Sequence, residues 1–167
     1  KVIFAPDKHL GAYVQRATGR DLVLWDGVCE VHVDISIDKL KFLLGKHPDA
    51  KLVAHPECPP HILAEADHVG STSSLLQFVQ TDPGTTFIVA TEGGILHKMR
   101  AAVPGKTLIP APANSENSCA CAECPYMKLN TLEKVYAALL NGQPEIVLEE
   151  SVRTGAERSL RRMMELG

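Results

Sequence analysis

Short apolar runs alternate with amphipathic segments along most of this chain, and that alternation restricts its fold more than any other feature. Runs rich in β-branched residues predict strands at 1–6, 21–25, 50–55, 85–91 and 106–112, with a brief one at 68–70. Apolar side chains at helical spacing predict helices at 10–18, 36–47, 59–66, 71–81, 93–103, 130–142 and 149–167. Short strands alternating with helices are typical of α/β layers around small parallel sheets.

Residues that cap helices mark several of these boundaries. Ser36 is a candidate N-cap for the segment 36–47, because a serine hydroxyl can accept a hydrogen bond from a free backbone N–H of the first turn. Gly19 and Gly142 follow helical patterns and are expected to end them.

Three predicted strands end in polar residues that can do chemistry, within the strings "WDGVCEVH", "AHPECPP" and "ATEGG". Ligands of open α/β sheets gather at the carboxyl ends of the strands. We therefore expect the functional site at this edge. Neither G-x-G-x-x-G nor G-x-x-x-x-G-K-[ST] occurs, so neither of these nucleotide-binding fingerprints is predicted.

The charge and hydropathy patterns disfavour two classes of partner. The 167 residues carry a formal net charge of −3 and no basic stripe, which argues against nucleic acid. No apolar run approaches the roughly 20 residues of a membrane span, and no signal-peptide pattern is present. We expect a cytoplasmic protein that does not bind membranes.

Five cysteines, an odd number, argue against a secreted disulfide framework. Cys119, Cys121 and Cys124 lie close together, and the pair Cys121–Cys124 has C-x-x-C spacing. That spacing allows a redox disulfide, whereas zinc or an iron–sulfur cluster would need further ligands. Pro125 follows Cys124, which frees that thiol from helix geometry and favours it as a ligand.

Two motifs combine nucleophilic or basic side chains. Cys29 and His32 fit either a buried thiol beside a satisfied histidine, or a metal-binding thiolate beside a substrate-binding imidazole. His55 and Glu57 alternate, so an extended backbone would point both to one side as an acid/base pair. A proline-stiffened surface loop is the alternative there. Cys58 is expected to pack in the core.

Gly70 and three hydroxyl residues open the predicted helix at 71–81. Free N–H groups and the hydroxyls of Ser71 and Thr72 could bind phosphate or carboxylate. Ordinary N-capping is the alternative, although capping needs only one hydroxyl.

Four stretches together resemble the quinolinate synthase family: "FAPDKHLGAYV", "LWDGVCEVH", "KLVAHPECPP" with "ADHVGSTSSLLQFV", and "CPYMKLNTLEKVYAALLNG". The resemblance runs over essentially the whole chain and corresponds to roughly the last two-thirds of the family's sequence. It implies three similar αβα domains around a pseudo-threefold axis. The expected division is 1–31 for the end of the second domain, 32–115 for the third, and 116–167 for the cluster-cysteine loop and C-terminal helices.

The same resemblance implies a transferase of NAD biosynthesis that condenses iminoaspartate with dihydroxyacetone phosphate to quinolinate, with a functional link to L-aspartate oxidase. It implies a 4Fe–4S cluster with one iron not liganded by protein. Cys29 and Cys124 match two of the three cluster cysteines, and the third has no match in this chain. Glu57 and His55 match catalytic positions. The substrate-binding positions are matched by His32, His55, Glu57, Ser71 and Thr72.

Two other functions remain open at this point. One is a non-catalytic metal or redox module with zinc or a disulfide at Cys119–Cys124. The other is a phosphate-binding α/β domain with structural cysteines. Neither needs an acid/base pair at His55 and Glu57.

Overall fold

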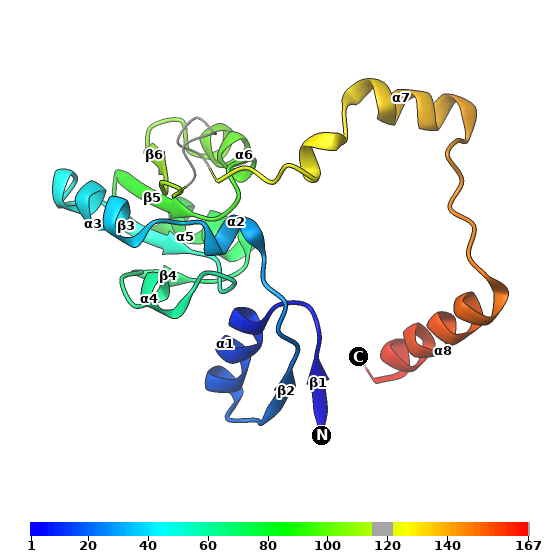
Figure 1. Ribbon diagram of the computed structural model, residues 1–167. Helices are drawn as coiled ribbons and strands as arrows, with labels where there is room; N and C mark the ends of the chain where they lie inside the picture. Colours follow the sequence, from blue (N-terminus) through cyan, green and yellow to red (C-terminus); the bar gives the residue numbers. More distant parts are fainter. Residues whose placement is uncertain (115–121, 167) are drawn as a thin grey trace. The chain divides into compact units, whose positions relative to one another are not determined.

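The computed structural model describes residues 1–114 and 122–166. The chain forms two compact units, Lys1–Pro125 and Tyr126–Gly167 (Figure 1). The strands are β1 (Val2–Phe4), β2 (Leu22–Leu24), β3 (Lys51–Ala54), β4 (His68–Val69), β5 (Thr86–Ala90) and β6 (Thr107–Pro110). The helices of the first unit are α1 (Lys8–Thr18), α2 (Glu30–Val33), α3 (Ile37–Lys46), α4 (Pro60–Leu63), α5 (Thr72–Thr81) and α6 (Ile95–Ala102).

The first 24 residues form a β–α–β motif. β1 and β2 pair in parallel, with Phe4 opposite Leu24. A Cβ atom added at Gly11 would stand 2.5 Å from Leu24 Cδ2 and 2.9 Å from Phe4 Cδ1. Glycine at this position therefore lets α1 lie close against both strands.

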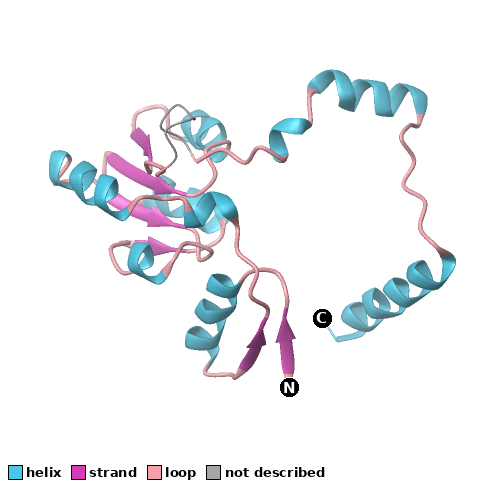
Figure 2. Cartoon of the chain, in the orientation of Figure 1, coloured by secondary structure: helices cyan, strands magenta, loops and turns pink. Residues whose placement is uncertain are grey.

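The remaining strands form one parallel sheet with the order β4-β3-β5-β6 (Figure 2). Ala54, at the end of β3, is in register with Val69 of β4 and with Ala90 of β5. The carboxyl ends of these three strands consequently lie at one edge of the sheet, and the segments that follow them start side by side.

Buried side chains on the two faces of the sheet form two separate clusters, as period-2 alternation requires. On one face Leu52 and Ile88 pack with Leu40 of α3 and Ile62 of α4. On the other face Phe87 packs with apolar residues of α5 and α6, which include Leu75, Val79, Leu96 and Met99. The four-stranded sheet is thus the middle layer of an αβα arrangement, and the predicted α/β fold with small parallel sheets is confirmed.

The second unit contains a short 3-10 turn, η1 (Met127–Leu129), followed by α7 (Leu132–Asn141) and α8 (Glu150–Leu166). Thr131 caps α7, and Gly142 ends it with φ 62°. That left-handed backbone favours glycine, so the predicted helix end is confirmed there, as it is at Gly19 with φ 67°. Among the described helices, none combines the length and the apolar character that crossing a bilayer would require.

Several helix ends differ from the sequence prediction: α4 is shorter than the predicted 59–66, and α1 starts earlier than expected. α1 begins at Lys8 instead of residue 10, because Asp7 is its N-cap and accepts a hydrogen bond from the Leu10 N–H at 2.8 Å. Ser36 caps α3 as predicted, through the Lys39 N–H. The expected three-domain arrangement and its boundaries remain predictions.

Candidate active site

The candidate site lies at the carboxyl edge of the four-stranded sheet, where the segments after β3 and β5 meet α2. The N–H of His55, just after β3, donates to the Ala90 carbonyl at the end of β5, at 3.0 Å. His32 Nε2 of α2 lies 3.0 Å from the hydroxyl of Thr91, the residue after β5. These two contacts place the three predicted strand-end motifs, "WDGVCEVH", "AHPECPP" and "ATEGG", next to one another.

Cys29 and His32 reach the site from a single helical turn. Cys29 is the N-cap of α2, and its carbonyl accepts from the Val33 N–H at 3.1 Å. Residues three apart lie on one face of a helix, so the Cys29 thiol and the His32 ring are neighbours. The sequence pattern placed this segment after a strand but did not predict the helical turn.

Asp7 fixes the start of that turn from a distant part of the sequence. Its Oδ2 accepts from the Cys29 N–H at 2.9 Å, while its Oδ1 accepts from Leu10. Asp7 is 3% exposed, so both hydrogen bonds are shielded from water. No functional role was predicted for Asp7 from the sequence; its position after Pro6 and before a helical pattern was the available signal.

The Glu57 carboxylate lies beside the Nδ1 atoms of two histidine rings. Its Oε2 is 3.2 Å from His32 Nδ1 and 3.8 Å from His55 Nδ1. The two rings stack with centroids 4.8 Å apart. His55 and Glu57 were expected to meet through extended backbone, but they meet through a turn in which the Cys58 N–H donates to the His55 carbonyl at 2.9 Å. Pro56 stands at the second position of this turn, which its fixed φ favours.

Burial changes the acid–base properties of these three groups in opposite directions. Desolvation first and the nearby His55 second lower the pKa of His32 to about 4. Desolvation also lowers the pKa of His55. The pKa of Glu57 is raised, first by desolvation and second by the negative charge of Asp7. At neutral pH the site therefore combines neutral imidazoles with a carboxylate of increased basicity, which suits proton transfer.

Two of the described thiols border the site and one is sealed in the core. Cys29 and Cys124 are half-buried free thiols that both pack against the cluster containing Leu52 and Ile62. Cys58 is fully buried, its Sγ donates to the Ala90 carbonyl at 3.3 Å, and burial raises its pKa to about 12. The prediction that Cys58 packs is confirmed.

Glu92 holds the segment that carries Cys124. Its Oε1 accepts from the Cys124 N–H at 3.3 Å, and its Oε2 accepts from the Gly94 N–H at 2.7 Å. A Cβ atom at Gly94 would stand 2.7 Å from Glu92 Oε2. The absence of a side chain at Gly94 thus allows the Glu92 side chain to fold back toward its own loop.

Ser71 and Thr72 follow β4, the strand next to β3, and both are exposed. Ser71 caps α5 through the Ser74 N–H at 3.3 Å. The Gly70 N–H donates to the Ala54 carbonyl at 3.1 Å, which places this junction beside the start of the His55 segment. The predicted anion site here stays a prediction. Cys119 and Cys121 lie outside the described residues.

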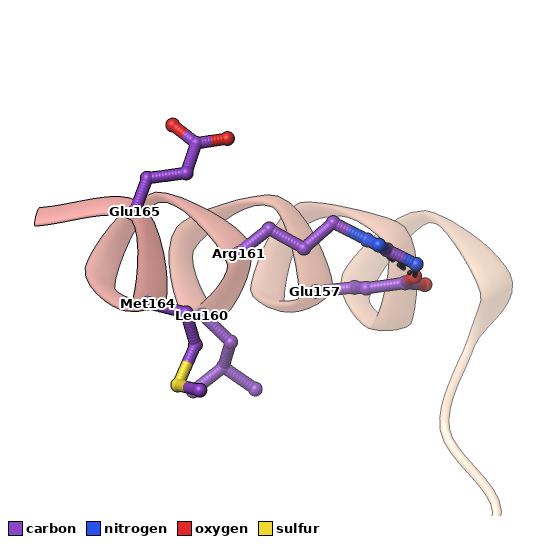
Figure 3. A pocket seen from close by; sticks show the side chains of 5 residues that line it. All are labelled: Glu157, Leu160, Arg161, Met164 and Glu165. Atoms are coloured by element: carbon purple, nitrogen blue, oxygen red, sulfur yellow. Dashed lines mark hydrogen bonds and ion pairs between the residues drawn. The ribbon is translucent and has the colours of Figure 1, made fainter. Parts of the chain in front are cut away.

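A shallow hollow on α8, drawn in Figure 3, is a separate feature of the second unit. It is lined by Glu157, Leu160, Arg161, Met164 and Glu165. Arg161 pairs with Glu157 along the helix at 2.6 Å, so these charges satisfy each other. Its lining residues include neither cysteine nor histidine, and we assign it no chemistry.

Comparison with known proteins points to one family. A family model described as "Quinolinate synthetase A protein" matches residues 1–165. A quinolinate synthase of Trichormus variabilis is 52% identical over 165 residues, which cover 99% of this chain and 50% of that protein. A quinolinate synthase of Synechococcus sp. is 50% identical over 163 residues, covering 98% of this chain and 51% of that protein.

The chain therefore spans about half the length of the curated relatives it matches, less than the two-thirds or so expected from the sequence resemblance.

Proposed function

The chain belongs to the quinolinate synthetase A family, and on this basis we propose that it forms part of a quinolinate synthase active site. The reaction condenses iminoaspartate with dihydroxyacetone phosphate and releases phosphate and water. The observation that carries the proposal is the convergence of Cys29, His32, His55 and Glu57 at one sheet edge. A thiol, two imidazoles and a carboxylate at one place supply both a metal ligand and acid–base groups.

The thiols at this edge fit an iron–sulfur cofactor. Cys29 and Cys124 are free, half-buried thiols that pack against the same group of buried apolar side chains. Cys58 is fully buried, and its raised pKa makes it unsuited to bind metal. We propose that Cys29 and Cys124 hold a 4Fe–4S cluster together with a third ligand from outside this chain. When bound, such a cluster supplies a Lewis-acidic iron that polarises a substrate oxygen.

Glu57 is proposed as the acid/base that moves protons between substrate atoms. Its raised pKa brings the carboxyl closer to neutral pH, where it can accept a proton and return it. It is 23% exposed, so a substrate can reach it.

His55 and His32 are proposed to orient the substrate. His55 Nδ1 accepts from the Glu57 N–H at 3.3 Å, so the neutral ring carries its proton on Nε2 and can donate to a substrate oxygen. Thr91 holds the other ring through His32 Nε2. Ser71 and Thr72, at the next strand end, are proposed to bind an anionic group of the substrate.

We also propose that the protein is cytoplasmic and functionally linked to L-aspartate oxidase. A disulfide between Cys121 and Cys124 would give these two thiols a redox role. These proposals rest on the family and on the C-x-x-C spacing.

The cluster assignment is tested by Cys29→Ala and Cys124→Ala in the complete protein, reconstituted anaerobically with iron and sulfide. Each variant is expected to lose most of its bound iron and its turnover. Cys58→Ala is the matched control and should keep both. Retention of the cluster and turnover in either the Cys29 or the Cys124 variant would overturn the assignment.

The acid/base assignment is tested by Glu57→Gln, which keeps the shape of the side chain. Turnover should fall by about 100- to 10,000-fold, while iron content stays at the level of the unmodified protein. Unchanged turnover would remove Glu57 from the mechanism.

A further inference from the structure

Cys29, His32 and Glu57 offer three ligand atoms that lie within 4.8 Å of one another. Thiolate, imidazole and carboxylate are the ligand types of mononuclear zinc sites. This group does not include Cys124, so it differs from the thiol pair proposed to hold the iron–sulfur cluster.

The spacing of two of these groups already matches one tetrahedral ion. With metal–nitrogen and metal–oxygen bonds of about 2.0–2.2 Å, two ligand atoms of a tetrahedral zinc stand about 3.4 Å apart. His32 Nδ1 and Glu57 Oε2 are 3.2 Å apart. The Cys29 sulfur lies within 4.8 Å of a ring nitrogen of His32 and a carboxylate oxygen of Glu57, and a rotation of its half-buried side chain can shorten these distances.

His32 Nδ1 makes no hydrogen bond within the described part of the chain, so its lone pair is available to a metal ion. Among the described residues it is the buried side-chain nitrogen without a hydrogen bond, and the side chain is 6% exposed. Glu57 is near enough for an ion pair but is not aligned to accept a hydrogen bond from Nδ1. If Nε2–H donates to Thr91, the Nδ1 lone pair faces a carboxylate with nothing positive between them.

Thr91 supplies the support that a metal-binding histidine usually has. Such a histidine donates its second ring N–H to a nearby oxygen, which fixes the tautomer and the ring orientation. The Thr91 hydroxyl, 3.0 Å from His32 Nε2, occupies that position.

From these contacts we propose that the cluster-free protein binds a single tetrahedral zinc ion through Cys29, His32 and Glu57. The Cys29 thiol loses its proton to solvent on binding, and one thiolate and one carboxylate balance the two positive charges of zinc. Three protein ligands leave a fourth position for water or a substrate oxygen. Because Cys29 cannot serve both groups at once, zinc bound here competes with cluster assembly.

Cobalt(II) is a suitable probe, because its bond to a thiolate gives a charge-transfer absorption that zinc lacks. The cluster-free, reduced complete protein is titrated with Co²⁺ and then with Zn²⁺, which should displace it. One equivalent is expected to bind with a thiolate–cobalt band. Cys29→Ser, His32→Gln and Glu57→Gln should each weaken binding at least about tenfold.

Cys124→Ser is the control that separates this site from the cluster. It should bind Co²⁺ as the unmodified protein does while failing to assemble the cluster. Thr91→Val, which removes the oxygen beside His32 Nε2, should weaken Co²⁺ binding about tenfold. Circular dichroism of each variant verifies that it is folded.

A second measurement does not depend on the variants. Zn²⁺ added to the unmodified cluster-free protein should protect Cys29 from alkylation, read by mass spectrometry, and leave Cys124 reactive. Absence of a thiolate–cobalt band, equal protection of both thiols, or loss of Co²⁺ binding in Cys124→Ser would overturn the zinc site. None of these results would bear on the cluster, whose assembly is measured separately with iron and sulfide.

Discussion

The carboxylate of Asp7 accepts a hydrogen bond from the backbone N–H of Cys29 at 2.9 Å, across 22 positions of sequence. The same carboxylate caps α1 through Leu10. One buried acid therefore couples the first helix of the chain to the thiol at the start of α2.

Asp7→Ala is expected to destabilise the fold and impair cluster assembly. Loss of the cap and an unsatisfied buried N–H at Cys29 together should cost about 2–4 kcal/mol of unfolding free energy. Denaturant unfolding measures this cost. Thr131→Ala, which removes the equivalent cap of α7, is the control: it should cost about 1 kcal/mol and leave iron content unchanged. Equal iron content in both variants would exclude a positioning role for Asp7.

Gly94→Ala should disturb the Cys124 segment without unfolding the sheet. The new methyl group would stand 2.7 Å from Glu92 Oε2 and push this carboxylate away from the loop it organises. Because Glu92 Oε1 accepts from the Cys124 N–H, we expect slower cluster assembly and a small change in stability. Gly105→Ala is the control, since a Cβ atom there meets nothing within 4 Å. Identical assembly rates in the two variants would contradict this role of Glu92.

The stability of the cluster-free protein should fall as pH drops from about 6.5 toward 4. The pKa of His32 is about 4 in the folded protein and 6.5, the ordinary value, in the unfolded chain. Between these two pH values the unfolded chain binds a proton at His32 that the folded protein does not bind. The full loss is on the order of 3 kcal/mol. Glu57 acts in the opposite sense, because its raised pKa favours the folded state when the carboxyl is protonated.

Comparing unfolding free energies of the unmodified protein and His32→Gln across this pH range isolates the histidine contribution. The difference between the two curves should shrink toward acid. A constant difference from pH 7 to pH 4 would show that His32 is not buried in its neutral form.

Alkylation should separate the described thiols by burial. Cys29 and Cys124 are half-buried and are expected to react with iodoacetamide in the folded cluster-free protein. Cys58 is fully buried with a pKa of about 12, so it should react only after unfolding. Peptide mass spectrometry at increasing denaturant concentration distinguishes the three. Early labelling of Cys58 would contradict its place in the core.

Much of the fold could be predicted from local patterns. The apolar stripe after Ser36 and the glycines at 19 and 142 lie where the structure has a capped helix and two helix ends. Polar residues after β3 and β5 could be recognised as strand ends, because the periodicity changes at His55 and Thr91. These signals are local, so a single sequence contains them.

Other parts of the site could not be predicted in this way. The backbone at Pro56 forms a turn instead of extended chain, and Asp7 and Glu92 act through hydrogen bonds to Cys29 and Cys124 far along the sequence. The residues around Asp7 and Glu92 do not indicate which distant backbone N–H groups these carboxylates bind.

The sequence by itself determined the alternation of strands and helices, the helix caps, and which chemical groups stand at strand ends. The tertiary structure alone decided that β3 lies next to β5, so that His55 and Glu57 meet His32 and Thr91. The physical reason is that strand order depends on which apolar faces bury each other, a non-local balance of packing, whereas periodicity and capping act within a few residues.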